Sequence, residues 1–147
     1  MLMADALTID VTSLVKGSEE LKKKLVFLTQ QVDDVLTAGA SDIATRAKVL
    51  APVDLGGLRS SIAYDVTKPL EKHITVNVGY AAYVEFGTGV YAASAVGKLP
   101  ADWQEFAAKF KGKKQVKGMM PQPYLFPAYE ENRTKILDQV EAVLKTI

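Results

Sequence analysis

Alternating apolar and polar residues open the chain and predict a first strand. Over residues 7–12 the apolar side chains recur with a period of two, which places them on one face of a strand. Lys16 and Gly17 then predict a turn. Ser18 is expected to cap the following helix by accepting a hydrogen bond from a backbone N–H of its first turn. The sequence therefore predicts a strand before the first helix.

From residue 21 the apolar spacing becomes helical and stays so for about 30 residues. Gly39 interrupts this stripe at a cost of about 1 kcal/mol relative to alanine, so the pattern allows either one kinked helix or two shorter ones. Pro52 ends the helix, because the residue before a proline disfavours α geometry. The apolar residues of the stripe are Leu21, Leu25, Leu28, Val32, Val35, Ile43, Ala47 and Leu50.

Two further stretches, residues 61–66 and 73–78, alternate with a period of two and have one apolar face each. The residues between them, 68–71, predict a hairpin connection, so the two strands should be antiparallel. Together with the opening strand they make an expected antiparallel sheet of three or more strands, packed on the long helix. The predicted fold class is therefore α+β.

Residues 87–121 are rich in glycine and predict a long loop, an insertion within a single domain of residues 1–147. We expect this loop to be mobile in the free protein and ordered in an assembly. Pro127 suits the first turn of a last helix with helical apolar spacing. A short helix inside the loop is expected to start near Asp102 and to place on one face Trp103, Phe106, Ala107 and Phe110.

The composition excludes several classes of function. Eighteen Lys and Arg balance 17 Asp and Glu, and the net charge of +1 gives no broad basic field for non-specific nucleic-acid binding. The chain has no cysteine, so zinc-thiolate sites and thiol nucleophiles are excluded. No apolar run approaches the ~20 residues of a membrane span, and residues 1–10 lack the pattern of a signal peptide. We expect a soluble, unexported protein without a cofactor.

The segment 51–62 is dense in turn-forming residues and predicts a corner between the long helix and the next strand. Its Asp can bond nearby backbone N–H groups, and its glycines can take positive φ. A simple change of chain direction accounts for this composition. The residues of this corner are Pro52, Asp54, Gly57, Leu58 and Arg59.

A single acid, Glu85, lies in the aromatic and small-residue segment 80–88. An unpaired charge in such surroundings is costly, so Glu85 is expected to be either half of a buried ion pair or a catalytic group with a shifted pKa. We favour the structural interpretation, with Arg59 as the partner. The neighbours of Glu85 in this segment include Tyr80, Tyr83, Phe86 and Gly87.

The proline-stiffened segment 119–128 either fills the core or makes a subunit contact, since a stiff segment loses little entropy on binding. Candidate interface residues are Trp103, Phe106, Phe110, Pro121, Pro123, Tyr124, Phe126 and Pro127. His73, the only histidine, falls on the polar side of its strand without groups to complete a catalytic set. Five lysines could contact DNA or an acidic partner, although a solvated stretch is the simpler interpretation: Lys109, Lys111, Lys113, Lys114 and Lys117.

Three motifs follow one another along the chain. They are Ala51-Pro52-Val53-Asp54 with Gly57-Leu58-Arg59-Ser60-Ser61-Ile62, then Tyr80-Ala81-Ala82-Tyr83-Val84-Glu85-Phe86-Gly87-Thr88, then Pro121-Gln122-Pro123-Tyr124-Leu125-Phe126-Pro127-Ala128. In this order they resemble the gene-product-ten-like family of small head-tail joining proteins of long-tailed phages and prophages. The resemblance runs from about Ser18 to the C-terminus. The family usually has Thr where this chain has Leu55, which removes a hydroxyl that could cap the corner.

The resemblance implies a virion structural protein without enzymatic activity, of the kind described as neck, tail-completion or minor tail protein. Such a protein is implied to form a ring, expected to be six-fold, with connector or tail-tube proteins as neighbours and passing contact with DNA in the channel. Such a protein is implied to be in the host cytoplasm before assembly and in the virion afterwards. Two alternatives remain: an enzyme using Glu85 or Asp54, and a small nucleic-acid-binding module using the lysine-rich loop. The second lacks stacking aromatics among its lysines.

Overall fold

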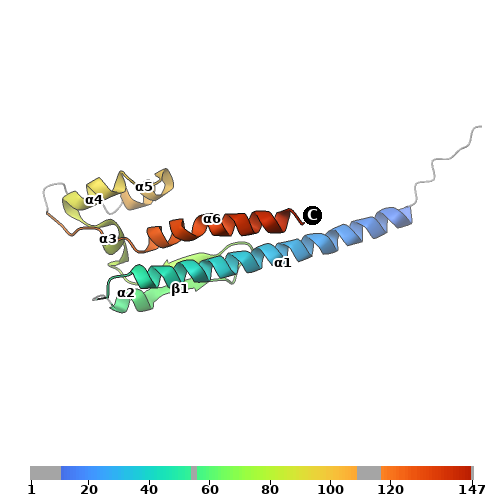
Figure 1. Ribbon diagram of the computed structural model, residues 1–147, viewed down its shortest axis with the longest axis horizontal. Helices are drawn as coiled ribbons and strands as arrows, with labels where there is room; N and C mark the ends of the chain where they lie inside the picture. The colour runs from blue at the N-terminus through green and yellow to red at the C-terminus, as the bar shows by residue number, and fades with distance from the viewer. Residues whose placement is uncertain (1–10, 54–55, 109–116, 147) are drawn as a thin grey trace, which may run out of the picture.

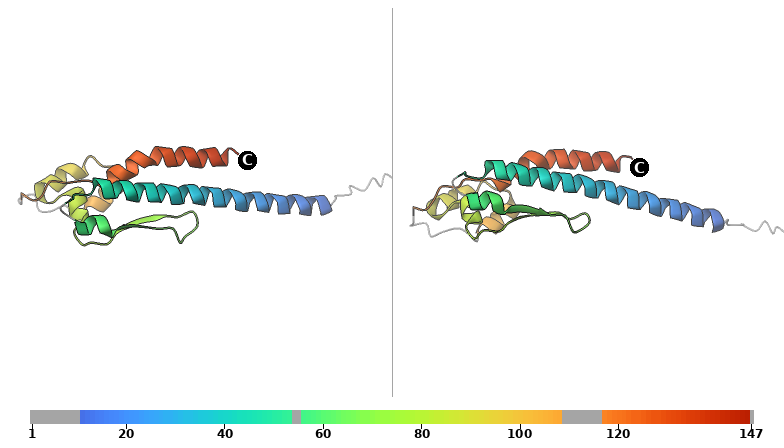
Figure 2. Two further views of the ribbon diagram at one scale, coloured as in Figure 1. Left: turned by 60° about the horizontal axis from the view of Figure 1, so that its bottom comes forward. Right: turned by 90° about the horizontal axis from the view of Figure 1, so that it is seen from below.

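The computed structural model describes residues 11–53, 56–108 and 117–146. The helix α1 (Val11–Leu50) forms the long axis of the molecule. The helix α6 (Leu125–Leu144) runs along one side of α1, and a two-stranded hairpin runs along another (Figures 1 and 2). Short helices gather at the C-terminal end of α1. Within the described ranges, no helix combines the length and apolar character that crossing a membrane requires.

The first helix is one unbroken element of 40 residues, about 60 Å long at 1.5 Å per residue. It includes the predicted turn, because Ser18 is helical and its Oγ donates a hydrogen bond to the Val15 carbonyl instead of capping a helix. The predicted opening strand is wrong at residues 11 and 12, which are helical, while residues 7–10 lie outside the described residues. Helical spacing begins earlier than expected, since apolar residues repeat every seven positions at Leu14, Leu21, Leu28 and Val35.

Gly39 neither kinks nor divides α1, and its missing side chain lets α6 approach. A Cβ at position 39 would lie 2.6 Å from Cδ1 of Ile136 in α6. An ion pair of 2.9 Å between Lys135 and Asp42 lies beside this contact. Three of the four neighbouring buried positions on α1 are also small, namely Ala40, Ala44 and Ala47, and the fourth is Ile43. Small residues on α1 therefore allow the two helices to pack closely.

The predicted hairpin is confirmed. Strands β1 (Ile62–Asp65) and β2 (His73–Val76) pair antiparallel, with Ile62 opposite Val76. Their apolar face packs toward the core that α1 covers. The sheet of the described residues has two strands, so the prediction of three or more is wrong. At residues 11 and 12 the helical spacing that follows outweighs the short alternation.

Four short helices occupy positions where mostly loops were predicted: α2 (Gly56–Ser61), α3 (Ala81–Phe86), α4 (Gly89–Val96) and α5 (Ala101–Ala108). Only α5 was predicted, near Asp102. The predicted loop 87–121 is wrong over α4, whose alanine-rich sequence favours a helix despite the glycine at its start. In α2 the glycines are helical and do not take the positive φ that glycine permits.

The last predicted helix is confirmed as α6, with Pro127 in its first turn. The core lies where the C-terminal half of α1 meets α2, the hairpin, α3 and the start of α6. Its buried members are Ile43, Ala44, Ala47, Ala51, Leu58, Ile62, Val84, Tyr124 and Ala128. The N-terminal part of α1 extends beyond both α6 and the hairpin (Figures 1 and 2).

Candidate functional site

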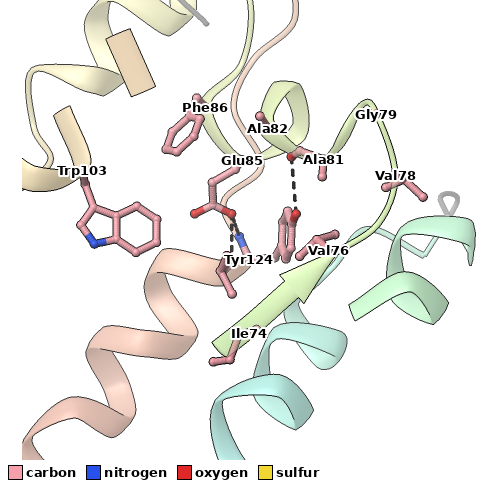
Figure 3. A pocket seen from close by; sticks show the side chains of 11 residues that line it. Ile74, Val76, Val78, Gly79, Ala81, Ala82, Glu85, Phe86, Trp103 and Tyr124 are labelled. Atoms are coloured by element: carbon pink, nitrogen blue, oxygen red, sulfur yellow. Dashed lines mark hydrogen bonds between the residues drawn. The ribbon is translucent and has the colours of Figure 1, made fainter. Parts of the chain in front are cut away.

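The carboxylate of Glu85 closes the N-terminus of α6 (Figure 3). Its Oε2 accepts hydrogen bonds from the backbone N–H groups of Tyr124 and Leu125, at 2.8 and 2.9 Å. Its Oε1 accepts one from the N–H of Phe126 at 2.8 Å. The first N–H groups of a helix have no partner inside the helix and lie at the positive end of its dipole. A carboxylate there accepts their hydrogen bonds and interacts favourably with the dipole. Glu85 thereby joins α3 to α6.

Glu85 is 5% exposed, and its surroundings change its acidity. Burial raises the pKa of the carboxyl above its usual value, and the three N–H bonds oppose this shift only in part. The predicted ion pair with Arg59 is wrong, because Arg59 Nη2 donates instead to the Ala51 carbonyl at 3.3 Å. Both oxygens of Glu85 are held by backbone N–H groups, so the carboxylate acts as a structural acceptor.

Tyr124 is fixed at both ends of the residue. Its backbone N–H donates to Glu85, and its hydroxyl donates to the Ala81 carbonyl at 3.4 Å (Figure 3). The side chain is 1% exposed, and burial raises its pKa. The structure therefore places Tyr124 in the core of this chain. Of the two interpretations of segment 119–128, Tyr124 agrees with the one in which the segment fills the core.

Residues 118–121 cross the end of α3 in close contact with it. The N–H of Thr88 donates to the Met119 carbonyl at 2.9 Å, and the N–H of Met119 donates to Thr88 Oγ1 at 2.7 Å. Gly87 has a φ of 74°, and a Cβ there would lie 2.7 Å from the Met119 carbonyl oxygen. Gly118 has a φ of 67°, and its Cβ would lie 2.2 Å from the Thr88 carbonyl oxygen. Both positions require glycine.

The corner after α1 packs at the same end of the molecule. Leu58 of α2 is fully buried in the core. A Cβ at Gly57 would lie 3.0 Å from the hydroxyl oxygen of Tyr80, just before α3. Pro52 is half-buried, and Asp54 lies outside the described residues. The three motifs found in the sequence thus meet: the corner contacts segment 80–88, whose Glu85 holds the start of α6.

The predicted interface residues divide into packed and exposed positions. Trp103 is half-buried within the chain, with its ring 5.0 Å from Phe126 and 6.4 Å from Phe86, both edge-to-face. Pro123 is exposed, whereas Pro121, Phe126 and Pro127 are half-buried. Tyr83 is exposed and Phe86 buried. The Phe106 side chain and the whole of Phe110 lie outside the described residues.

Few of the polar candidates lie in the described part of the chain. Lys117 is exposed, while Lys109, Lys111, Lys113 and Lys114 lie outside the described residues. His73 is exposed, as predicted, and pairs with Glu71, a neighbour that the sequence analysis overlooked. In the part of the chain that the structure describes, no group of three or more His, Cys, Asp or Glu could hold a metal ion.

Asp33 is a structural anchor that the sequence analysis missed. Its Oδ1 lies 2.8 Å from Lys72 Nζ and accepts a hydrogen bond from the Leu70 N–H at 2.7 Å, which fastens the hairpin tip to α1. The bond to Lys72 and then that to Leu70 lower the pKa of Asp33. The sequence did hold a signal for Asp33. It stands three residues before Leu36 and seven before Ala40, so it shares a helix face with these apolar residues. An acid on that side of the helix needs a partner.

Through these contacts, short motifs from distant parts of the chain hold a long helix against its neighbours. The chain matches, over residues 14–87, the model of the HK97-gp10-like family, described as "Bacteriophage HK97-gp10, putative tail-component". The matched residues make up just over half of the chain, and this protein belongs to that family. No curated protein and no solved structure matches the chain. Segment 118–128, which Glu85 and Thr88 hold, lies beyond the matched residues.

Proposed function

We propose that this protein is a structural component of a phage virion, located at the neck or tail end. In this proposal it joins or completes the tail by forming a ring with copies of itself and with neighbouring connector or tail-tube proteins. The proposal rests on membership of a family that is described as a phage tail component. A ring of identical subunits has the closed symmetry that most homo-oligomers adopt. The six-fold form is an expectation that comes from the family resemblance.

The position of Glu85 supports a structural role over a catalytic one. A general acid or base must reach the proton that it transfers, whereas both oxygens of Glu85 are engaged by backbone N–H groups. The cavity beside it, of about 340 Å³, is lined mainly by apolar side chains such as Ile74, Val76 and Trp103 (Figure 3). The buried acid therefore has a sufficient explanation in the fold, and we assign it no reaction.

The test is the composition and shape of the particles. Deleting the gene from the phage or prophage that encodes it should leave heads and tails unjoined, or tails incomplete, in electron micrographs. Supplying the wild-type protein from a plasmid should restore joined particles, and mass spectrometry should then find the protein in them in several copies. Normal particles from the deletion strain, or particles without the protein, would refute the proposal.

A further inference from the structure

An apolar heptad repeat runs along α1, and only its C-terminal part is covered. With Leu21 at position d of the heptad abcdefg, Leu25 is at position a, and the repeat gives the helix one apolar stripe. We call this stripe the seam. Its one polar member is Ser18, whose hydroxyl donates a hydrogen bond to the Val15 carbonyl. The seam residues between 14 and 35 are Leu14, Ser18, Leu21, Leu25, Leu28, Val32 and Val35.

Helix α6 covers the continuation of the seam toward the C-terminal end of α1. Gly39, the next a position, packs against Ile136 of α6. The chain just beyond α6 reaches back to Leu28, because Thr146 lines a hollow with this residue. The seam residues from 28 to 35 are half-buried. The cover that the chain itself supplies therefore ends near Leu28.

N-terminal to this point the seam is exposed. Every residue from 15 to 27 is exposed, and we call residues 15–27 the projecting segment (Figures 1 and 2). Within it Leu21 is 67% exposed and Leu25 66%. A stripe with heptad spacing is the surface on which one helix packs against another, each side chain inserting between residues of the facing helix. The projecting segment therefore has the pattern of a helix whose partner is absent from the described chain.

The charged positions next to the exposed seam are cationic. Positions e and g flank positions a and d, and charges there select the partner helix. In the projecting segment Lys22 is at e and Lys24 is at g, and no acid occupies either position between residues 15 and 31. Glu19 and Glu20 are at b and c, farther from the seam. A partner helix therefore matches this segment in charge if it carries acids beside its own apolar stripe.

A second copy of the segment does not supply these acids. Each copy has four lysines against two glutamates, a net charge of +2. In a parallel pair Lys24 would face Thr29 and Lys22 would face Gly17, so no ion pair would form across the seam. An antiparallel pair sets e against e and g against g, and lysine is the only charged residue at these positions. Pairing with itself would therefore gain no attraction between charges.

We propose that the projecting segment binds a helix of another protein, one that carries an apolar heptad stripe flanked by acidic residues. The covered part of α1 supports this, because α6 combines close packing at Gly39 with an ion pair between Asp42 and Lys135. The partner helix continues along the seam from the place where α6 ends. This binding goes beyond the proposed function, since it requires neither a ring nor a particle.

The test uses two synthetic peptides of about three heptads that share one apolar stripe. One peptide carries Glu at positions e and g, and the other carries Lys there. Fluorescence anisotropy of each labelled peptide measures its Kd for the full chain. The Glu peptide should bind at least about tenfold more tightly than the Lys peptide. Added salt should reduce this ratio, because salt screens exposed charges.

Two neighbouring residues of the projecting segment provide a variant and its control. Leu25→Gln changes the seam, whereas Val26→Gln changes a residue that is 70% exposed and lies outside the seam at position b. Leu25→Gln should weaken binding of the Glu peptide at least about tenfold, and Val26→Gln should leave it as in the wild type. Circular dichroism checks that each variant is folded.

A pair of double variants tests the charges in the same way. Lys22→Glu with Lys24→Glu makes both flanks of the seam acidic and should reverse the preference between the two peptides. Lys16→Glu with Lys23→Glu changes the net charge equally, but both residues are at position f, on the side of the helix away from the seam. This control should retain the preference for the Glu peptide.

The inference is overturned if neither peptide binds, if both bind equally, or if Leu25→Gln binds as well as Val26→Gln. Self-association of the wild type that Leu25→Gln abolishes would assign the seam to a second copy instead. Binding to anionic lipid vesicles that Leu25→Gln abolishes would assign it to a membrane surface. None of these results changes the particle test of the proposed function. A protein found in tailed particles that binds neither peptide would keep its function and lose this binding surface.

Discussion

Gly39 of α1 and Ile136 of α6 approach so closely that a Cβ on Gly39 would lie 2.6 Å from Cδ1 and 2.7 Å from Cγ1 of Ile136. Alanine normally gains about 1 kcal/mol over glycine inside a helix. The clash should outweigh that gain here, because overfilling a packed site costs about 1–3 kcal/mol and Ile is stiff near its backbone. We expect Gly39→Ala to lower the free energy of unfolding, measured with denaturant.

Gly17 provides the matched control on the same helix, since a Cβ there would have nothing within 4 Å. Gly17→Ala should leave stability unchanged or raise it by up to about 1 kcal/mol. Adding Ile136→Ala to Gly39→Ala should cost less than the sum of the two single changes, because the contact no longer exists. Equal stability of Gly39→Ala and Gly17→Ala would mean that the helices can separate without cost.

Replacing Glu85 by Gln should destabilise the protein by about 1–3 kcal/mol, because an amide NH₂ would face backbone N–H groups and leave one without an acceptor. Glu130→Gln, an exposed change on α6, should have little effect. Burial raises the pKa of Glu85 above its ordinary 4.5, so the folded state binds its proton more tightly than the unfolded state does. The stabilisation that Glu85 adds to the free energy of unfolding is therefore full below pH 4.5 and is lost as the pH rises through the folded-state pKa.

The stability difference between wild type and Glu85→Gln should accordingly be largest in acid and narrow toward neutral pH. Thermal unfolding of both proteins across this range measures the difference. A gap that widens with rising pH would show that the N–H bonds, not burial, dominate the pKa of the Glu85 carboxyl.

Gly87→Ala should destabilise strongly, because the φ of 74° strains any side chain by about 1–3 kcal/mol and the added Cβ would meet backbone atoms of Met119 and Pro121. Gly79→Ala is the control, since a Cβ at Gly79 has nothing within 4 Å. Differential scanning calorimetry should show a clear loss of Tm for the first variant only. A near-wild-type Tm for Gly87→Ala would mean that residues 119–121 move aside freely.

Asp33→Asn should release the hairpin tip from α1. Loss of the charge weakens the bonds to Lys72 and Leu70, so the Leu70 amide should exchange its hydrogen faster. Asp34→Asn, the neighbouring change, should leave this exchange unaltered. Because the pKa of Asp33 is lowered below its ordinary 3.8, the wild-type anchor should persist above pH 3.8 and be lost only as the pH falls through the lower folded-state pKa.

Sequence patterns predicted the elements that have a long periodic stretch, or two adjacent stretches joined by a turn. The helix from residue 21, the hairpin and α6 follow directly from their apolar spacing. Short helices such as α4 were missed, because glycine content was taken as evidence for a loop and tertiary contacts decide short elements.

The sequence predicted which residues belong to the candidate site but not which hydrogen bonds they make. Glu85 was recognised as a buried structural acid, yet its partners are backbone N–H groups of residues 124–126, which carry no side-chain signature. The assignment of Arg59 failed for this reason: sequence can suggest charged partners, but any residue can supply a backbone donor. Asp33 was missed because its partner Lys72 lies in a hairpin whose approach to α1 has no local pattern.

The packing of α1 against α6 also sets an order of events during synthesis. Arg46 and Glu131 are 85 positions apart, and Asp42 and Lys135 are 93 apart. A ribosome adding about 5–20 residues per second therefore exposes α1 for several seconds before its partner helix exists. During that interval its apolar stripe is open to other nascent or finished chains. The cell's supply of holding chaperones, and the rate at which the last quarter of the message is translated, should thus influence how much of this protein reaches its folded state.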